Sequence, residues 1–332
     1  MKEILNQLFN HKSLSSEQAE KVLKSIAAGE YNTSQMAAFI SVYLMRSITV
    51  EELSGFRTAL LEHCIPVDLN GYDTIDLCGT GGDGKDTFNI STLSSFLVAG
   101  AGGRVSKHGN YGVSSTCGSS NVMEQLGYKF SNDPAKLKNE LEASGICFMH
   151  APLFNSAMKN VAPVRKELGM KTFFNMLGPM VNPSFPKYQL VGVYSLELAR
   201  LYNYLYQQTD KRFIILHSLD GYDEISLTGD FKMISNETEK DVSPESLGFA
   251  RLLPEQLKGG NNVAESVAIF MNILEGKGSI EQNNVVIANA GLAMSCLNPG
   301  KSIEECLAVS RESLESKKAL TSLKKLLSLQ NQ

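Results

Sequence analysis

A segment rich in glycine and hydroxyl-bearing residues, DLCGTGGDGKDTFNIST (76–92), has the composition of a phosphate-binding loop. Glycines let the backbone approach an anion closely, and a turn of this kind before a helix directs N–H groups at the ligand. Asp83 is unexpected beside a phosphate, unless its carboxylate holds a ribose hydroxyl or a metal-bound water. The spacing fits neither a Walker A loop nor the dinucleotide fingerprint. Taken alone, the segment is equally consistent with a flexible turn before a capped helix.

A second segment, VSKHGNYGVSSTCGSSNVMEQLG (105–127), repeats this design. An apolar start leads into two glycines and a run of serines, and then into a predicted helix. Lys107 would supply a mobile cation for a phosphate group, and Asn110 could orient a polar substrate through its donor and acceptor atoms. Two such loops at neighbouring strand ends indicate a ligand with two separated phosphate groups.

A third segment, HSLDGYDEIS (217–226), places Asp223 beside Glu224 directly after an apolar strand. Mg²⁺ that is shared with a polyphosphate is held by few protein carboxylates and several waters. An isolated Asp-Glu pair is most simply explained as a solvated acidic turn. Beside two phosphate loops, the pair predicts a magnesium site.

A fourth segment, residues 156–183, contains Arg165 on a predicted helix next to the apolar, proline-bearing stretch LGPMVNP. An arginine beside an apolar lid can bind a planar carboxylate through two parallel hydrogen bonds. The alternative is an exposed helix arginine paired with Glu167 or another acid. The histidines His11, His63 and His150 have no partners in these motifs and are interpreted as structural or surface residues.

The elements that must position these segments change character along the chain. Residues 1–68 read as helices: the first has a serine start in SLSSEQ and a glycine stop at Gly29, the next begins at an Asn32 or Thr33 cap, and another opens with Thr49, which stands at capping-box spacing from Glu52. From residue 69 to 332, strands over 74–78, 104–109, 146–149, 188–194 and 212–218 alternate with helices. This order predicts an α/β fold: a small N-terminal helical domain over 1–68, joined by helices from about 156–182, and a large domain over 69–332. The large domain would have a mostly parallel sheet covered by helices, and residues 258–262 (KGGNN) would form a loose loop.

The bulk composition excludes several classes of protein. The formal net charge of −4 argues against nucleic acid as the main partner. Six scattered cysteines without a CxxC pair indicate free thiols in a reducing compartment. The start of the chain has no signal-peptide pattern, and no apolar run has membrane-spanning length. We therefore expect a soluble, cytoplasmic protein that does not bind membranes.

The motifs DLCGTGGDGKDTFNIST, KHGN, AMKNVAPVRKELG, FNMLGPMVNP and DGYDEIS resemble those of the anthranilate phosphoribosyltransferase family in order and spacing. This resemblance covers essentially the whole chain. It implies a homodimer with a nucleoside phosphorylase/phosphoribosyltransferase-like fold that uses 5-phosphoribosyl 1-diphosphate (PRPP), Mg²⁺ and anthranilate. The reaction would be the second step of tryptophan synthesis from chorismate.

By position, the resemblance assigns three sets of site residues. The PRPP-binding set is Gly79, Gly82, Asp83, Thr87, Asn89, Ile90, Ser91, Thr92, Lys107, His108, Gly109, Asn110, Ser114, Ser115 and Ser119. The anthranilate-binding set is Gly79, His108, Asn110 and Arg165, and the metal-binding set is Ser91, Asp223 and Glu224. The chain departs from the family pattern at Tyr111, Thr116, Cys117, Asn155, Ser156 and Lys171.

The expected chemistry is displacement of diphosphate at the anomeric carbon of the ribose. Aryl amines are weakly basic, so anthranilate is already neutral at pH 7 and no residue is assigned as a general base. Rate enhancement would come from positioning, Lys107 and the metal site. Two alternatives stay open: a pyrimidine nucleoside phosphorylase-like enzyme, which would not need the acidic metal pair, and a non-catalytic nucleic-acid-binding relative, which would need a basic groove.

Overall fold

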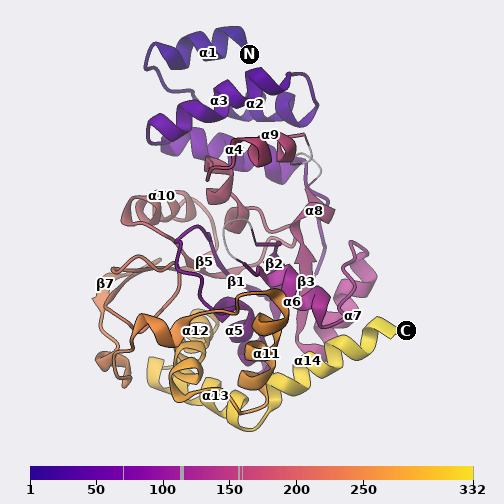
Figure 1. Cartoon of the computed structure of the whole chain (residues 1–332), viewed down its shortest axis with the longest axis vertical. Coiled ribbons are helices and arrows are strands. Elements are labelled where there is room, and N and C mark those ends of the chain that lie inside the picture. The colour runs from indigo at the N-terminus through magenta and orange to yellow at the C-terminus, as the bar shows by residue number, and fades with distance from the viewer. Residues whose placement is uncertain (70, 113–115, 156–157, 159, 332) are drawn as a thin grey trace. The chain divides into compact units, whose positions relative to one another are not determined.

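The computed structural model describes residues 1–69, 71–112, 116–155, 158 and 160–331. The chain divides into two compact units (Figure 1). Unit 1 comprises Met1–Val67 and Ala151–Phe185, and unit 2 comprises Asp68–His150 and Pro186–Gln332. Among the described helices, none combines the length and the apolarity that a membrane span requires.

Unit 1 is built from helices, and among those that the structure describes α2, α3 and α4 begin at capping boxes. Its α-helices are α1 (Lys2–Phe9), α2 (Ser16–Ala27), α3 (Thr33–Met45), α4 (Val50–Glu62), α8 (Ala151–Phe154) and α9 (Ala162–Leu168). Two 3₁₀ helices, η2 (Phe173–Met176) and η3 (Gly178–Met180), follow. Capping boxes at Ser15, Asn32 and Thr49 begin α2, α3 and α4, which confirms the predicted helix starts.

The core of unit 1 combines stacked rings with a buried ion pair. The rings of Phe39, Phe56 and Phe173 contact one another in edge-on and stacked arrangements. Beside them, the fully buried carboxylate of Glu52 pairs with Arg46 and accepts a hydrogen bond from the backbone N–H of Leu14 at 3.0 Å. The N3 residue of the α4 capping box therefore also ties the first helices to α4.

Unit 2 contains a seven-stranded sheet within the described residues, in the order β3-β2-β1-β4-β5-β6-β7. The strands are β1 (Ile75–Gly79), β2 (Val105–Gly109), β3 (Ile146–His150), β4 (Tyr188–Gly192), β5 (Arg212–Ser218), β6 (Phe231–Ser235) and β7 (Glu239–Val242). Strands β1 to β5 pair in parallel, and β6 and β7 are antiparallel. The five predicted strands are confirmed. Strands β6 and β7 were not predicted from the sequence, and β7 reads Glu-Lys-Asp-Val, a composition that disfavours strands but suits an exposed sheet edge.

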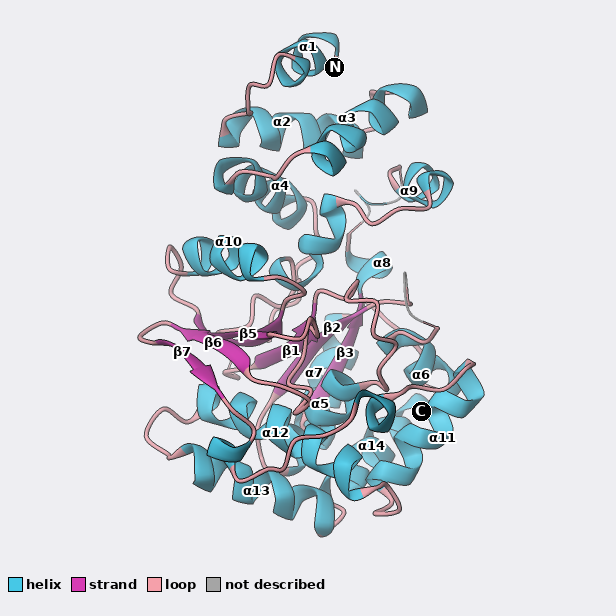
Figure 2. Ribbon diagram, turned by 60° about the vertical axis from the view of Figure 1, so that its left-hand side comes forward, coloured by secondary structure: helices cyan, strands magenta, loops and turns pink. Residues whose placement is uncertain are grey.

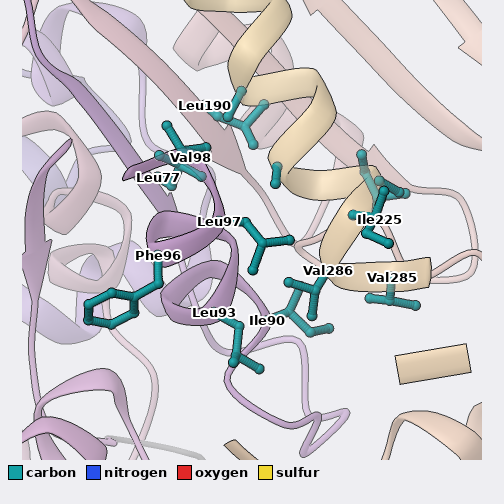
Figure 3. Packing of buried hydrophobic residues seen from close by; sticks show 14 of the residues in the cluster. Leu77, Ile90, Leu93, Phe96, Leu97, Val98, Leu190, Ile225, Val285 and Val286 are labelled. Carbon is teal, nitrogen blue, oxygen red and sulfur yellow. The ribbon is translucent and has the colours of Figure 1, made fainter. Parts of the chain in front are cut away.

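Helices cover both faces of this sheet (Figure 2). Helix α10 (Leu196–Tyr206) lies on one face, and α5 (Ile90–Gly100), α12 (Ile280–Leu297) and α13 (Ile303–Glu315) lie on the other. The remaining helices of unit 2 are α6 (Ser119–Gln125), α7 (Pro134–Ser144), α11 (Val263–Leu274), α14 (Lys318–Ser328), η4 (Glu245–Leu247), η5 (Pro254–Leu257) and η6 (Leu329–Asn331). Side chains of β1, β4, α5 and α12 meet in the main hydrophobic core (Figure 3). The predicted α/β fold with a mostly parallel sheet is confirmed.

The strand order places a topological switch point between β1 and β4. These strands are neighbours, yet the chain continues from β1 to β2 on one side and from β4 to β5 on the other. Ligands of open α/β sheets bind in the crevice outside the carboxyl ends of the strands at such a point. The glycine-rich loop follows β1, so it lies where this rule places a ligand.

Candidate active site

The two adjacent carboxylates after β5 are held by backbone N–H groups of the glycine loop and of α5. Asp223 is buried, and its Oδ2 accepts a hydrogen bond from the N–H of Gly81 at 2.6 Å. Oε1 of Glu224 accepts from the N–H of Ser91, in the first turn of α5, at 2.8 Å. The structure therefore joins the first and third sequence motifs, which lie far apart in the chain.

Two strand-terminal glycines make room for Asp223. A Cβ atom on Gly79, the last residue of β1, would lie 2.3 Å from Oδ2 of Asp223. A Cβ atom on Gly192, the last residue of β4, would lie 1.5 Å from the backbone oxygen of Asp223. A side chain at Gly79 would displace the Asp223 carboxylate, and one at Gly192 would displace the backbone of the acidic loop. Gly192 was not predicted as a site residue, and the only sequence signal is a glycine near the end of the apolar run YQLVGVY.

The electrostatics of this site favour a bound cation. Burial raises the pKa of Asp223 well above its usual range, and the charges of Glu224 and Asp83 raise it further. Burial also raises the pKa of Glu224 to about 7, against the opposing effect of the Ser91 N–H and the charge of Lys107. Both carboxylates are therefore disfavoured as free anions, and a cation bound beside them would stabilise their charged form.

The donor set fits Mg²⁺. Across the described residues, no three His, Cys, Asp or Glu side chains form a cluster that could enclose a metal ion. Asp223, Glu224 and the hydroxyl of Ser91 offer oxygen atoms only, from few residues. An open set of oxygen ligands suits Mg²⁺, which keeps several waters and shares its coordination with substrate phosphates.

Lys107 is not the mobile cation that the sequence analysis predicted. Its side chain is 1% exposed, and Nζ donates a hydrogen bond to the backbone oxygen of Leu77 on the adjacent strand at 2.6 Å. Burial lowers the pKa of Lys107, whereas the charges of Asp76 and Glu224 raise it. The expected mobility was wrong because the pairing of β1 with β2 encloses this side chain and fixes its position; a role of Lys107 at a phosphate stays a prediction.

The second loop is joined to the first by Asn89. This residue is the N-cap of α5, but its side chain makes no capping bond and Nδ2 instead donates to the backbone oxygen of Cys117 at 3.0 Å. The hydroxyl of Ser119 donates to the backbone oxygen of Asn110 at 3.3 Å. Oδ1 of Asn110 accepts from the N–H of Tyr111 at 2.8 Å. The first and second motifs are therefore in direct contact, while Ser114 and Ser115 lie outside the described residues.

The other predicted PRPP residues differ in how accessible they are. The side chains of Ile90 and Thr92 are buried at the start of α5, and Ile90 belongs to the hydrophobic core. Gly82, Asp83, Thr87, His108 and Gly109 are half-buried. Any contact of Ile90 with a ligand would therefore come from its backbone.

The segment 258–262, expected to be a loose loop, begins in contact with the glycine loop. Thr87 and Lys258 form an isolated β-bridge. The N–H of Gly259 donates to the backbone oxygen of Asp86 at 2.8 Å, and the N–H of Phe88 donates to that of Leu257 at 3.1 Å. Residues 259–262 have no helix or strand, as expected of a loop, but the start of the segment is paired because the backbone of a polar, glycine-rich segment can bond to another loop without a hydrophobic signal. This pairing ties the segment to the glycine loop.

Arg165 lies in α9 of unit 1 and is half-buried. Its Nη2 donates to Oδ1 of Asn175 at 3.1 Å, and its guanidinium carbon lies 5.4 Å from the centroid of the Phe174 ring. Burial lowers the pKa of Arg165. Within the part of the chain that the structure describes, no carboxylate pairs with this guanidinium, so the alternative pairing with Glu167 is not observed. A half-buried cation with neutral partners is suited to bind an anion.

His150 has partners that the sequence did not reveal. Its Nδ1 lies 2.9 Å from the hydroxyl of Ser120, and its ring stacks on Phe130 with the centroids 4.5 Å apart. The ring of Tyr111, one of the departures from the family pattern, contacts His150 edge-on, and its hydroxyl donates to Glu124. His150 is therefore a structural residue, as predicted, that fixes the second loop at the carboxyl ends of β2 and β3.

Comparison with known proteins places the chain in a family. The family model described as "Glycosyl transferase family, a/b domain" matches residues 71–320, and that described as "Glycosyl transferase family, helical bundle domain" matches residues 2–64. Anthranilate phosphoribosyltransferase of Flavobacterium psychrophilum is 61% identical over 326 residues, which cover 98% of each chain. The crystal structure of anthranilate phosphoribosyltransferase from Thermus thermophilus superposes with a TM-score of 0.91 at 30% identity, over 99% of each chain.

A more distant structure shares the fold. Anthranilate phosphoribosyltransferase from Saccharomyces cerevisiae, solved in complex with PRPP and Mg, has a TM-score of 0.92 at 24% identity and covers 99% of this chain and 97% of its own. The architecture and the family models define a glycosyltransferase with a helical part and an α/β part. The chain belongs to the anthranilate phosphoribosyltransferase family, and so it is a pentosyl-transferring enzyme of tryptophan biosynthesis, as the sequence analysis predicted.

Proposed function

We propose that the carboxyl ends of β1, β2 and β5 bind PRPP and Mg²⁺, and that the enzyme transfers the phosphoribosyl group to anthranilate there. The observation that supports this most strongly is the pair Asp223 and Glu224, held by the N–H groups of Gly81 and Ser91 at the phosphate-loop motif. The yeast relative was solved with PRPP and Mg, the same combination. Asp223 is buried and Glu224 is half-buried, and two such adjacent carboxylates would be costly without a cation; a divalent ion removes that cost.

The reaction forms a bond between the amine nitrogen of anthranilate and the anomeric carbon of the ribose. The bond from that carbon to the diphosphate oxygen breaks, its electron pair leaves with the diphosphate, and the amine loses one proton to solvent. Bound Mg²⁺ would neutralise charge on the departing diphosphate. Asp223, Glu224 and the Ser91 hydroxyl would hold the ion, and Lys107 would add a fixed positive potential. The amine is neutral at pH 7, so we assign no general base.

The two glycine-containing loops would bind different parts of the substrates. Gly79, Gly82, Asp83, Thr87 and Asn89 would contact the diphosphate and ribose through backbone N–H groups, hydroxyls and the Asp83 carboxylate. The second loop, through His108, Gly109, Asn110 and Ser119, would hold the other phosphate and orient the amine. Because Asn89 joins the loops at Cys117, binding at one loop constrains the other.

Arg165 is our candidate for the carboxylate of anthranilate. Its partners in unit 1 are the neutral Asn175 amide and the Phe174 ring. A planar carboxylate can accept two parallel hydrogen bonds from a guanidinium, and the Phe174 ring provides an apolar surface beside it.

We also propose that the enzyme is a cytoplasmic homodimer. Helix α3 carries apolar residues all round, which is typical of a helix that is covered on every side. Leu44 and Met45 on α3 and Phe9 on α1 are nevertheless exposed, Met45 by 89%. A second copy of the chain would cover this face. The six cysteines are free thiols, which suits a reducing compartment.

The fluorescence of anthranilate tests the function, because its consumption on addition of PRPP can be followed with and without Mg²⁺. The double variant Asp223→Asn, Glu224→Gln should lose at least about 100-fold in turnover, together with the dependence on Mg²⁺. Asp220→Asn is a matched control, because Asp220 is an exposed carboxylate of the same loop that accepts a hydrogen bond from Thr228. Full activity of the double variant at limiting Mg²⁺ would contradict the metal assignment. Phosphorolysis of a pyrimidine nucleoside without consumption of anthranilate would favour the alternative enzyme.

A further inference from the structure

Asn289 is a polar residue in the middle of a buried, apolar helix. It lies in α12, within the run Val285–Met294 that is buried throughout. An asparagine is unfavourable inside a helix, and a buried amide costs free energy unless it is hydrogen-bonded. Its presence there requires a partner outside the helix.

That partner is the residue directly after the acidic pair. Oδ1 of Asn289 accepts a hydrogen bond from the N–H of Ile225 at 3.1 Å, and Nδ2 donates to the backbone oxygen of Ile225 at 2.9 Å. Nδ2 also donates to the backbone oxygen of Val285 at 2.9 Å. Figure 3 shows Ile225 beside Val285 and Val286 of α12. Through Asn289, the backbone N–H and C=O groups of Ile225 are therefore both hydrogen-bonded to the core helix α12.

The acidic pair is thus held on both sides. The hydroxyl of Ser218 donates to the backbone oxygen of Glu224 at 2.7 Å. Asn289 also lines one small cavity together with Asp223, Glu224, Ser91 and Ser94. Among these cavity residues, the Asn289 side chain makes the described hydrogen bonds to the backbone of Ile225, the residue after Glu224.

We propose that Asn289 is a positioning residue for the divalent-cation site, acting through Ile225 on Glu224 and Asp223. This inference rests on the proposed function, in which these carboxylates hold Mg²⁺. Mg²⁺ demands near-ideal octahedral geometry, so a displaced ligand contributes much less to the affinity for the ion. Loss of a group that orients a metal ligand lowers metal affinity by about 10–100-fold.

The test measures binding of Mn²⁺, as a paramagnetic substitute for Mg²⁺, to the full-length enzyme with PRPP, followed by electron paramagnetic resonance. Asn289→Ala should weaken Mn²⁺ binding by about 10–100-fold and raise the Mg²⁺ concentration for half-maximal rate by a similar factor. The KM for anthranilate should stay within about twofold, because the hydrogen bonds described for the Asn289 side chain run to Ile225 in the acidic loop and to Val285 in its own helix. Ser94→Ala is the matched control, since Ser94 lines the same cavity but bonds to Val286 in α12.

Asn289→Asp covers the case in which the alanine variant fails to fold. It keeps the size of the side chain and the acceptor for the Ile225 N–H but loses both donors. If only charge mattered, the added carboxylate near the site would tighten cation binding. If Asn289 positions the acidic loop, its loss weakens cation binding. Unchanged or tighter Mn²⁺ binding in a folded Asn289 variant would overturn the inference.

The same assay separates this inference from the proposed function. If the double variant of Asp223 and Glu224 still binds Mn²⁺ like the unchanged enzyme, the metal assignment itself fails. If the double variant loses Mn²⁺ binding while the Asn289 variants keep it, only the role of Asn289 is wrong.

Discussion

Replacing Gly79 by alanine should displace Asp223 and lower turnover while leaving the fold in place. The new Cβ would lie 2.3 Å from Oδ2 of Asp223, and ordinary contacts at such an atom begin at 3.4 Å, so the carboxylate must retreat by about 1 Å. The hydrogen bond from Gly81 to Oδ2, now 2.6 Å long, would be stretched beyond good hydrogen-bonding distance. A misplacement of about 1 Å can cost about 100-fold in rate, which corresponds to about 2.7 kcal/mol of transition-state stabilisation.

The assay is the decay of anthranilate fluorescence at saturating PRPP and Mg²⁺, with thermal unfolding measured in parallel. Gly300→Ala is the control, because a Cβ atom added at Gly300 would have no atom within 4 Å and this residue lies outside the site. Turnover of the Gly79 variant within about threefold of the unchanged enzyme would refute the reasoning, because the position of the Asp223 carboxylate would then not matter for catalysis.

Two further perturbations test other parts of the enzyme. Arg165→Ala should raise the KM for anthranilate at least about 30-fold, equivalent to about 2 kcal/mol, because it removes one partner of a partly desolvated charge pair. The KM for PRPP should change little. Steady-state kinetics with each substrate varied in turn measure both values, and an equal rise of the KM for PRPP would contradict a specific role at anthranilate. The second perturbation concerns pH: burial lowers the pKa of His150 in the folded state, His108 lowers it further, and Glu124 opposes the shift. The neutral His150 ring therefore makes its full contribution to the free energy of unfolding above its pKa in the unfolded chain, which is about 6.5. This contribution is lost as the pH falls through the lower pKa of His150 in the folded state. Thermal unfolding at pH 7.5 and 5.0 should show a larger drop for the unchanged enzyme than for His150→Phe, and equal drops would contradict this assignment.

Local patterns in the sequence were sufficient for the motifs and for most of the elements, but not for β6 and β7. Capping residues such as Asn32 and Thr49 act on N–H groups within three residues, so their effect can be predicted from the local sequence alone. The five parallel strands are short apolar runs between turn signals. Their carboxyl ends lie at one edge of a sheet, and for this reason the glycine loop and the Asp223-Glu224 pair could be assigned to one site before any coordinates.

Only the tertiary structure decided which distant backbone groups meet. Lys107 became a buried fixed charge because β2 pairs with β1, and Gly192 became a site residue because Asp223 packs on it. Asn289 reads as an isolated amide in an apolar helix until Ile225 is placed beside it. Such contacts join atoms from segments far apart along the chain, and their energies depend on geometry at the scale of an ångström. A local pattern carries information about the conformation of its own segment, but it does not specify the position of a partner segment to that accuracy.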